Sequence, residues 1–174
     1  ACLQISFGAY YGFFALYMRD LDYSGQQTGI FIALGVLAEV GIFLIARRLI
    51  SQFGVWNLLF VSIALTGLRW YVMAAFADTF MVIVLSQLIH ALSFGLTHAV
   101  SVHFIHQFLP KAYQSRGQAV YISIAFGLGG AFGNYLAGQQ WQQGTNAYET
   151  FVTAAVFAAI GALSLLLCSR KEME

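Results

Sequence analysis

The sequence has very few charged residues. They make up 9% of its 174 positions, whereas 60% are hydrophobic and 16% aromatic. A soluble domain carries about a quarter charged residues, so this chain cannot cover a water-facing surface of its size. The composition indicates a protein whose surroundings are a lipid bilayer. No basic block is present that would suggest a nucleic-acid partner.

Proline and cysteine are also scarce, with one proline and two cysteines. Cys2 and Cys168 lie in apolar stretches, and we interpret them as small lipid-facing residues rather than as a disulfide. The chain begins at Ala1 inside an apolar run, with no initiator methionine and no basic segment typical of a signal peptide. We therefore expect a fragment of a longer protein.

Long apolar runs are what the sequence has in abundance. A membrane-spanning helix needs about 20 mostly apolar residues, and runs of this length follow one another with short connections. The predicted fold class is an all-α membrane protein with six transmembrane helices in one domain, residues 1–174. The predicted helices cover approximately residues 1–18, 24–46, 56–76, 80–108, 115–139 and 148–168.

The basic residues of the connections favour one side of the membrane. The second and fourth connections and the C-terminal tail contain Arg47, Arg48, Lys111, Arg116, Arg170 and Lys171. The other connections contain only Arg19, next to the acidic residues Asp20, Asp22, Asp78 and Glu149. By the positive-inside rule, we expect the even connections and both chain ends to be cytoplasmic.

The second and fifth predicted helices are the glycine-rich ones. This correspondence is the pattern expected of two inverted three-helix repeats, a common architecture of secondary transporters. Sequence identity between the two halves of the chain is not evident.

Three ionisable residues fall inside predicted spans, where a charge at mid-bilayer costs at least about 2.5–3.5 kcal/mol. Glu39 lies about 12 Å from one end of its helix, Arg69 about 20 Å and His90 about 15 Å. We predict that these three residues, from three different helices, meet at a polar substrate-binding or proton-coupling site. The alternative is a buried ion pair between Glu39 and Arg69 that only fixes helix packing.

Further candidates lie on the first and fourth helices. Tyr10, Phe14 and Tyr17 occur at helical spacing on one face, beside Tyr11, and suit an aromatic or sugar-like ligand. Packing or lipid contact is the other interpretation of these rings. His98 shares a helix with His90 and either lines the cavity or contacts another helix.

No cofactor, metal site or enzyme activity is predicted. All four histidines lie on the fourth helix, so a haem would lack a second axial histidine from another helix. No cluster of cysteines or carboxylates with metal-ligand spacing occurs. Nucleophile and phosphate-binding motifs are likewise missing from the sequence.

Several segments resemble phenylpropionate permease-like transporters of the major facilitator superfamily, which are related to lactose permease and the nucleoside–proton symporters. The matching segments are Tyr10-Tyr11-Gly12-Phe13, Tyr23-Ser24, Leu34-Gly35-Val36, Ala38-Glu39-Val40, Arg69-Trp70, and Gln87 with His90 and His98. The resemblance implies a twelve-helix fold of two six-helix halves, of which this chain would be the C-terminal half. The first and fourth helices here would line the cavity, and the second and fifth would face the other half.

The resemblance also implies roles for individual residues. Lactose permease carries a glutamate, an arginine and a histidine matching Glu39, Arg69 and His90, which serve sugar binding and proton coupling. It carries a second glutamate where this chain has Ser93, so its proton relay does not transfer whole. The implied function is proton-coupled symport of a small aromatic carboxylate, with Arg69 as the counter-ion.

Two other functions stay open at this point. Within transport, the alternative is an oligosaccharide or nucleoside symporter. A different class would be a non-transporting six-helix scaffold or a channel-like oligomer. The expected partners are the lipid bilayer, a small-molecule substrate, a proton and the N-terminal half, with a homodimer of this half as a further possibility; the expected location is a bacterial inner membrane.

Overall fold

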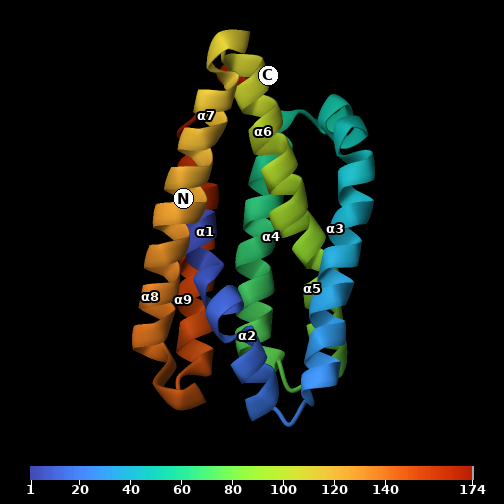
Figure 1. Cartoon of the computed structure of the whole chain (residues 1–174), viewed down its shortest axis with the longest axis vertical. Coiled ribbons are helices and arrows are strands. Elements are labelled where there is room, and N and C mark those ends of the chain that lie inside the picture. Colours follow the sequence, from blue (N-terminus) through green and yellow to red (C-terminus); the bar gives the residue numbers. More distant parts are fainter. Residues whose placement is uncertain (174) are drawn as a thin grey trace.

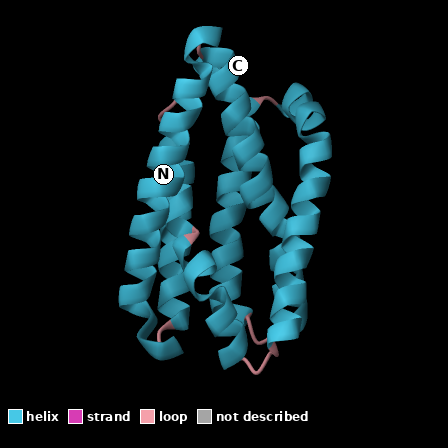
Figure 2. Ribbon diagram, in the orientation of Figure 1, coloured by secondary structure: helices cyan, strands magenta, loops and turns pink. Residues whose placement is uncertain are grey.

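The computed structural model describes residues 1–173, and every regular element in this range is helical (Figure 2). The helices run along the long axis of the molecule, side by side (Figure 1). Their bounds are α1 Cys2–Ser6, α2 Gly8–Asp20, α3 Gly25–Phe53, α4 Val55–Phe76, α5 Phe80–His90, η1 Ala91–Leu96, α6 Thr97–Phe108, η2 Lys111–Tyr113, α7 Gln114–Tyr121, η3 Ile122–Gly129, α8 Gly130–Trp141, η4 Gln142–Gly144, α9 Ala147–Leu165 and α10 Arg170–Met173.

Among the described residues, five continuous helical segments are long and apolar enough to cross a membrane. They are Gly25–Phe53, Val55–Phe76, Phe80–Phe108, Lys111–Gly144 and Ala147–Leu165. The first predicted span is also helical but changes direction at Phe7, where α1 ends and α2 begins. The described residues therefore form six long helical segments, of which the first is kinked rather than straight, followed by the short helix α10.

Two predicted boundaries are corrected by the structure. The second helix was expected to stop at residue 46, before Arg47 and Arg48, but α3 continues through both to Phe53. Charged residues at the membrane surface do not end a helix, because their long side chains reach water while the backbone bonds continue. Gly54 ends it, with a positive φ of 74° that suits glycine. The last helix ends at Leu165 rather than at residue 168.

The start of α3 is capped by side chains. Ser24 is the N-cap, and its side chain accepts a hydrogen bond from the backbone of Gln27. The Gln27 side chain in turn accepts one from the Ser24 backbone at 2.9 Å. This reciprocal capping box satisfies two of the N–H groups that a helix start leaves without partners.

The six segments differ in how much they are covered. α4 and α9 form the most extensive helix pair, and α2 packs against α8 while α3 packs against α5 and η1. The central core contains the fully buried rings of Phe7, Phe14, Trp70 and Phe151. α3 and the segment from η2 to η4 are the least buried of the five long segments.

The connections gather at two ends of the bundle (Figure 1). The α3–α4 and α6–α7 connections lie at the same end as the C-terminus, whereas the α2–α3, α4–α5 and α8–α9 connections lie at the other end. Ala1 lies part-way along the bundle. The end with the C-terminus carries Arg47, Arg48 and Lys111. The basic residues of the connections therefore lie mainly at one end of the bundle.

Candidate functional site

Three ionisable side chains from three helices form one hydrogen-bonded chain inside the bundle. The His90 Nε2 atom lies 2.7 Å from Glu39 Oε1, and His90 Nδ1 lies 2.9 Å from Arg69 Nη1. Arg69 is 2% exposed and His90 4%. The structure thus brings together the three residues that sequence reasoning placed at mid-membrane, with His90 between the carboxylate and the guanidinium.

The geometry assigns the proton on His90. An arginine nitrogen can only donate, so Nδ1 must accept the bond from Arg69. The ring proton of a neutral imidazole then lies on Nε2 and is donated to Glu39 Oε1. His90 is therefore neutral here, and it separates the positive and negative groups rather than adding a third charge.

Two serines complete the lining around Arg69. Arg69 Nε donates to Ser86 Oγ at 2.9 Å, and Nη1 also donates to Ser93 Oγ at 3.2 Å. Ser86, His90 and Ser93 lie at i, i+4 and i+7, one face of a helix. Sequence reasoning did not select these serines for the site, although this spacing around a membrane-buried histidine is a signal that would have found them.

The remaining nitrogen of Arg69 has no partner among the described residues. A guanidinium has five N–H groups, and the bonds to Ser86, His90 and Ser93 use those on Nε and Nη1. Nη2 is buried and makes no hydrogen bond. The guanidinium carbon lies 4.2 Å from the ring centroid of Trp70 and 4.9 Å from that of Tyr10. Aromatic faces thus cover the cation, while two of its donors are unused.

Two glycines let α3 approach closely enough to bring Glu39 to His90. A Cβ on Gly95 would lie 3.3 Å from Glu39 Cγ. A Cβ on Gly35 would lie 3.2 Å from Gln87 Oε1 and 3.7 Å from His90 Cδ2. Small residues at such crossings are how membrane helices reach short separations, and here the crossing carries the site.

The aromatic residues of α2 divide between the core and the surface. Tyr10 is buried and donates to Gln87 Oε1 at 2.8 Å. Phe14 is 1% exposed and packs on Tyr10, and Tyr17 stacks on Phe151 and donates to Met73 O at 3.4 Å. The face at i, i+4 and i+7 therefore turns toward the other helices.

Tyr11 is the exposed ring of this group, at 54%. Its ring stacks on Phe7 with 5.6 Å between centroids and meets Phe94 edge-on. Since Phe7 also touches His90, Tyr11 lies on the open side of the layer of rings that covers the charged network. Tyr11 is thus the ring of this group that is accessible from outside the layer.

His98 belongs to a column of stacked rings that leads away from His90. Phe94 lies nearly parallel to His90, at 7°, and to His98, at 8°. His98 Nδ1 lies 3.3 Å from the hydroxyl of Tyr121 on α7. The column crosses the π-helical turn η1, and its neighbour Phe126 lies in the second π-helical segment, η3. π-Helical turns inside longer helices are frequent at functional sites.

Besides Arg69, a second buried residue of the candidate site has a hydrogen-bond donor without a partner. Gln87 is fully buried, its Oε1 accepts from Tyr10, and its Nε2 has no partner among the described residues. Among the side chains that the structure describes, no three of His, Cys, Asp or Glu gather as they would around a metal ion. The candidate site thus offers unpaired hydrogen-bond donors, on Arg69 and Gln87, surrounded by aromatic rings.

These features define a multi-pass membrane protein whose helices enclose a charged, aromatic-lined site at mid-span. The description "MFS_1 like family" belongs to a family model that matches residues 1–153. The chain belongs to this family, which is of the major facilitator type. Its relatives are transporters rather than enzymes. The prediction of an all-α major facilitator fold is confirmed by this match and by the structural likeness described next.

Two curated transporters are similar in sequence. The "Probable 3-phenylpropionic acid transporter" of Escherichia coli (strain K12) is 33% identical over 129 residues, covering 72% of this chain and 32% of that protein. "Maltose permease" of Geobacillus stearothermophilus is 28% identical over 166 residues, covering 92% of this chain and 40% of that protein. The chain thus spans between about a third and two fifths of the length of these relatives.

Crystal structures of the nucleoside transporter NupG are similar in fold. Two of them, one of a mutant protein, match with TM-scores of 0.80 and 0.78 at 17% sequence identity. Each match covers 95% of this chain and 46% of the other. At this identity the likeness shows the fold alone.

Proposed function

We propose that this chain is the C-terminal six-helix half of a proton-coupled symporter that carries a small aromatic carboxylate by alternating access. The observation that carries the proposal is the buried Arg69 guanidinium, which has two unused N–H donors inside a surround of aromatic rings. The relative named a probable 3-phenylpropionic acid transporter supports this choice of substrate.

Arg69 is the group that we assign to the substrate carboxylate. An unmade hydrogen bond on a buried group costs about 1–3 kcal/mol, so an anion that reaches Nη2 gains by satisfying it. Carboxylates accept such charge-assisted bonds from arginine well. The rings of Phe7, Tyr10 and Trp70 cover the guanidinium in this conformation, which means that binding requires a rearrangement of the ring layer.

Glu39 and His90 are the groups that we assign to the coupled proton. A proton added to His90 has to go to Nδ1, where it displaces the bond from Arg69 Nη1 at 2.9 Å. A proton added to Glu39 weakens the contact with His90 Nε2 at 2.7 Å. Either change alters the partners of Arg69 directly or through one ring, and so links protonation to the anion-binding group.

An oligosaccharide or nucleoside symporter is the second candidate. The maltose permease match extends over 92% of this chain, and the solved structures similar in fold carry the name of a nucleoside transporter. The Gln87 amide, with its unpaired Nε2, is a group that suits hydroxyl-rich ligands. The unused donors on the Arg69 guanidinium favour an anionic substrate. Inhibition of uptake by a sugar or a nucleoside distinguishes the two candidates.

The open glycine faces of α3 and α8 are assigned to the N-terminal half. A Cβ added to Gly29 or Gly41 on α3, or to Gly130 on α8, would meet nothing within 4 Å. Glycines with open space beside them allow another helix to approach closely. Because the relatives are more than twice as long, we assign these faces to the N-terminal half, and a pair of copies of this half is the alternative cover.

The proposed location is a bacterial inner membrane, with the C-terminus and the α3–α4 and α6–α7 connections in the cytoplasm. The basic residues at that end of the bundle support this orientation. The sequence predicts that both chain ends are cytoplasmic. Ala1 lies part-way along the bundle (Figure 1), so we propose a cytoplasmic position for the C-terminus alone.

The test is uptake by the full-length protein in proteoliposomes under an imposed pH gradient. Labelled 3-phenylpropionate is the substrate, and maltose and a nucleoside are the competitors. We expect uptake that a protonophore abolishes and that neither competitor reduces. Uptake that the sugar or nucleoside inhibits would move the substrate to the second candidate.

Arg69→Gln is the decisive variant. We expect it to lose at least about 30-fold in uptake, because a buried charge-assisted interaction is worth about 2 kcal/mol or more. The control is Arg19→Gln, which removes an exposed arginine that pairs with its neighbour Asp20. Wild-type-like uptake by Arg69→Gln would refute the role assigned to Arg69.

A further inference from the structure

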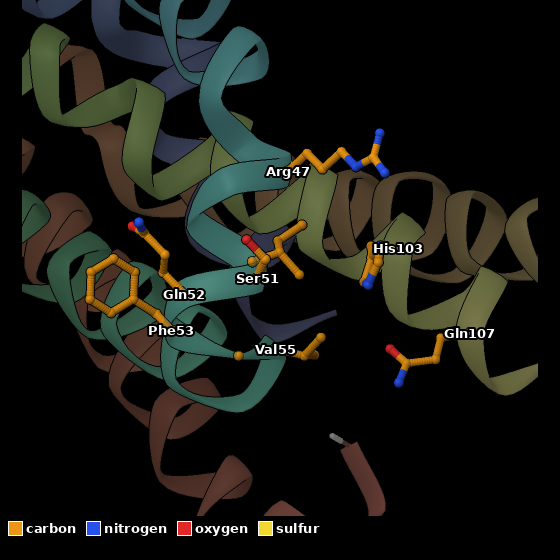
Figure 3. Close-up of a pocket in the computed structure, with 9 residues that line it drawn as sticks. Arg47, Ser51, Gln52, Phe53, Val55, His103 and Gln107 are labelled. Carbon is orange, nitrogen blue, oxygen red and sulfur yellow. The ribbon is translucent and has the colours of Figure 1, made fainter.

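A cavity of about 510 Å³ lies at the basic end of the bundle, away from the Arg69 site. It opens at the corner between α3 and α4, facing α6 (Figure 3). Ser51 and Val55 lie on one side of the gap, His103 and Gln107 on the other, and Arg47 lies at the rim (Figure 3). Neither the charged network nor the proposed transport mechanism uses any of these residues.

The lining has positive and hydrogen-bonding groups but no acidic residue among those described. Its polar members are Arg47, Ser51, Gln52, His103 and Gln107. The Arg47 guanidinium and the His103 imidazole are donors that phosphate oxygens accept, whereas the Ser51 hydroxyl already donates to Arg48 O at 2.9 Å. The cavity is therefore suited by charge to an anionic, oxygen-rich ligand.

The depth of the two basic side chains points to the source of that ligand. Arg47 lies six residues before the end of α3 at Phe53, and His103 five residues before the end of α6 at Phe108. At 1.5 Å per residue these positions are about 9 Å and about 8 Å from the same end of the bundle. Both groups thus share one level, close to the layer of lipid headgroups that borders the hydrocarbon core.

Apolar side chains continue from this level toward the middle of the membrane. Phe43 and Leu44, one turn before Arg47, are 46% and 81% exposed. A ligand with a phosphate at Arg47 and hydrocarbon chains along these residues would satisfy both parts of the surface. Basic pockets between transmembrane helices on the cytoplasmic side bind the headgroups of anionic lipids in other membrane proteins.

We propose that this cavity binds the headgroup phosphate of an anionic phospholipid, with the Arg47 guanidinium as its cation and the His103 imidazole as a hydrogen-bond donor. Ser51 and Gln107 line the cavity beside them, and Phe43 and Leu44 contact the acyl chains. The site would join the ends of α3, α4 and α6 through one lipid. It does not depend on which solute the protein carries.

The experiment is a titration of the full-length transporter in detergent with phosphatidylglycerol, with bound lipid counted by native mass spectrometry. Replacing both phosphate ligands, Arg47→Gln with His103→Gln, is expected to weaken binding about tenfold. Ser51→Phe, which fills the cavity and removes no charge, is expected to weaken binding as well. The control is Arg48→Gln, which removes the neighbouring charge outside the cavity lining and should change binding less than about twofold.

Three results would overturn the proposal. Equal weakening by Arg48→Gln would show attraction by overall charge rather than a site. Equal binding of phosphatidylcholine would show that the site does not recognise the net negative charge of the headgroup. Displacement of the lipid by inorganic phosphate or glycerol 3-phosphate at matched concentration would identify a soluble phosphate as the occupant.

Discussion

Glu39 shows at the scale of a single residue how hydrogen bonding and proton transfer can be separated. Its Oε1 accepts from His90 Nε2, and a glutamine oxygen in the same position could accept the same bond. A glutamine cannot take up a proton, however. A neutral substitution thus keeps the geometry of the network and removes only its capacity to titrate.

We predict that Glu39→Gln retains exchange of substrate across the membrane but loses accumulation driven by a pH gradient. The measurement is a comparison of equilibrium exchange with gradient-driven uptake in the same proteoliposomes. Glu149→Gln, on an exposed carboxylate in the first turn of α9, is the control and should leave both unchanged. Gradient-driven accumulation by Glu39→Gln would remove Glu39 from the proton path.

Two tyrosines of α2 provide a matched test of buried hydrogen bonding. Tyr10→Phe leaves Gln87 without the donor to its Oε1, in a side chain whose Nε2 is already unpaired. We predict a loss of about 1–3 kcal/mol in the free energy of unfolding. Tyr17→Phe removes a 3.4 Å contact with Met73 O from a half-buried ring, and its effect should stay below about 0.5 kcal/mol.

Thermal unfolding of the full-length protein in detergent, followed by circular dichroism, compares the two tyrosine variants. Both substitutions remove one hydroxyl from the same helix, so a general effect of the ring change is the same in each. Equal shifts of the melting temperature would show that the Tyr10–Gln87 bond contributes no more than the longer contact.

At the scale of helices, the packing of the first segment on α8 depends on missing side chains. A Cβ on Gly133 would fall onto the backbone of Ile5, and a Cβ on Gly8 onto the backbone of Gly133. The two backbones are thus in direct contact, as small residues in membrane helices allow. Because backbone atoms cannot rotate aside, any side chain at these positions has to push the helices apart.

We therefore predict that Gly133→Ala destabilises the protein by about 1–3 kcal/mol or more. The control on the same helix is Gly138→Ala, whose Cβ would lie at an ordinary 3.6 Å from Phe13 Cζ and should be tolerated. The measurement is the fraction of protein that stays monodisperse in detergent after heating. Equal survival of both variants would contradict the close contact between α1 and α8.

At the scale of the whole molecule, the two ends of the bundle are distinguished by charge. Arg47, Arg48, Lys111 and Arg116 belong to the end with the C-terminus, and Asp20, Asp22 and Asp78 to the other. The proposed orientation predicts which connections a reagent outside the cell can reach. The chain has two native cysteines, Cys2 and Cys168, which are replaced by serine for such a test.

We predict that an impermeant maleimide added to intact cells labels Thr79→Cys and Thr145→Cys in the connections at the acidic end. Ser51→Cys, near the α3–α4 connection, should be labelled only after the membrane is permeabilised. Gel-shift of the labelled full-length protein measures each accessibility. The reverse pattern would invert the orientation.

The sequence was sufficient for the helices, and it also led to the three ionisable residues that meet in the candidate site. Apolar runs of membrane-spanning length give the segments directly, and ionisable residues inside them give Glu39, Arg69 and His90. The kink at Phe7 and the π-helical segments η1 and η3 were not predicted, because they depend on packing between distant segments. The expected end of the second helix at residue 46 differs from that of α3 at Phe53, because arginines at the membrane surface do not interrupt a helix.

The individual contacts of the site could not be read from spacing alone. Tyr10 and Tyr11 are adjacent in sequence, yet one is buried and the other exposed, which depends on the direction of α2 after its kink. The pairing of His90 with both Glu39 and Arg69 depends on Gly35 and Gly95, whose effect appears only when α3 is placed against η1.

The connection between α3 and α4 consists of Gly54 alone, so one end of α3 is held without slack, whereas the other end has a longer connection to α2. A helix of this length acts mechanically as a lever about 44 Å long. A rotation of about 10° about Gly54 moves its far end by about 8 Å and Glu39, near its middle, by about 4 Å. The Glu39 carboxylate lies 2.7 Å from the His90 imidazole, so a small tilt of α3 would be enough to break this contact.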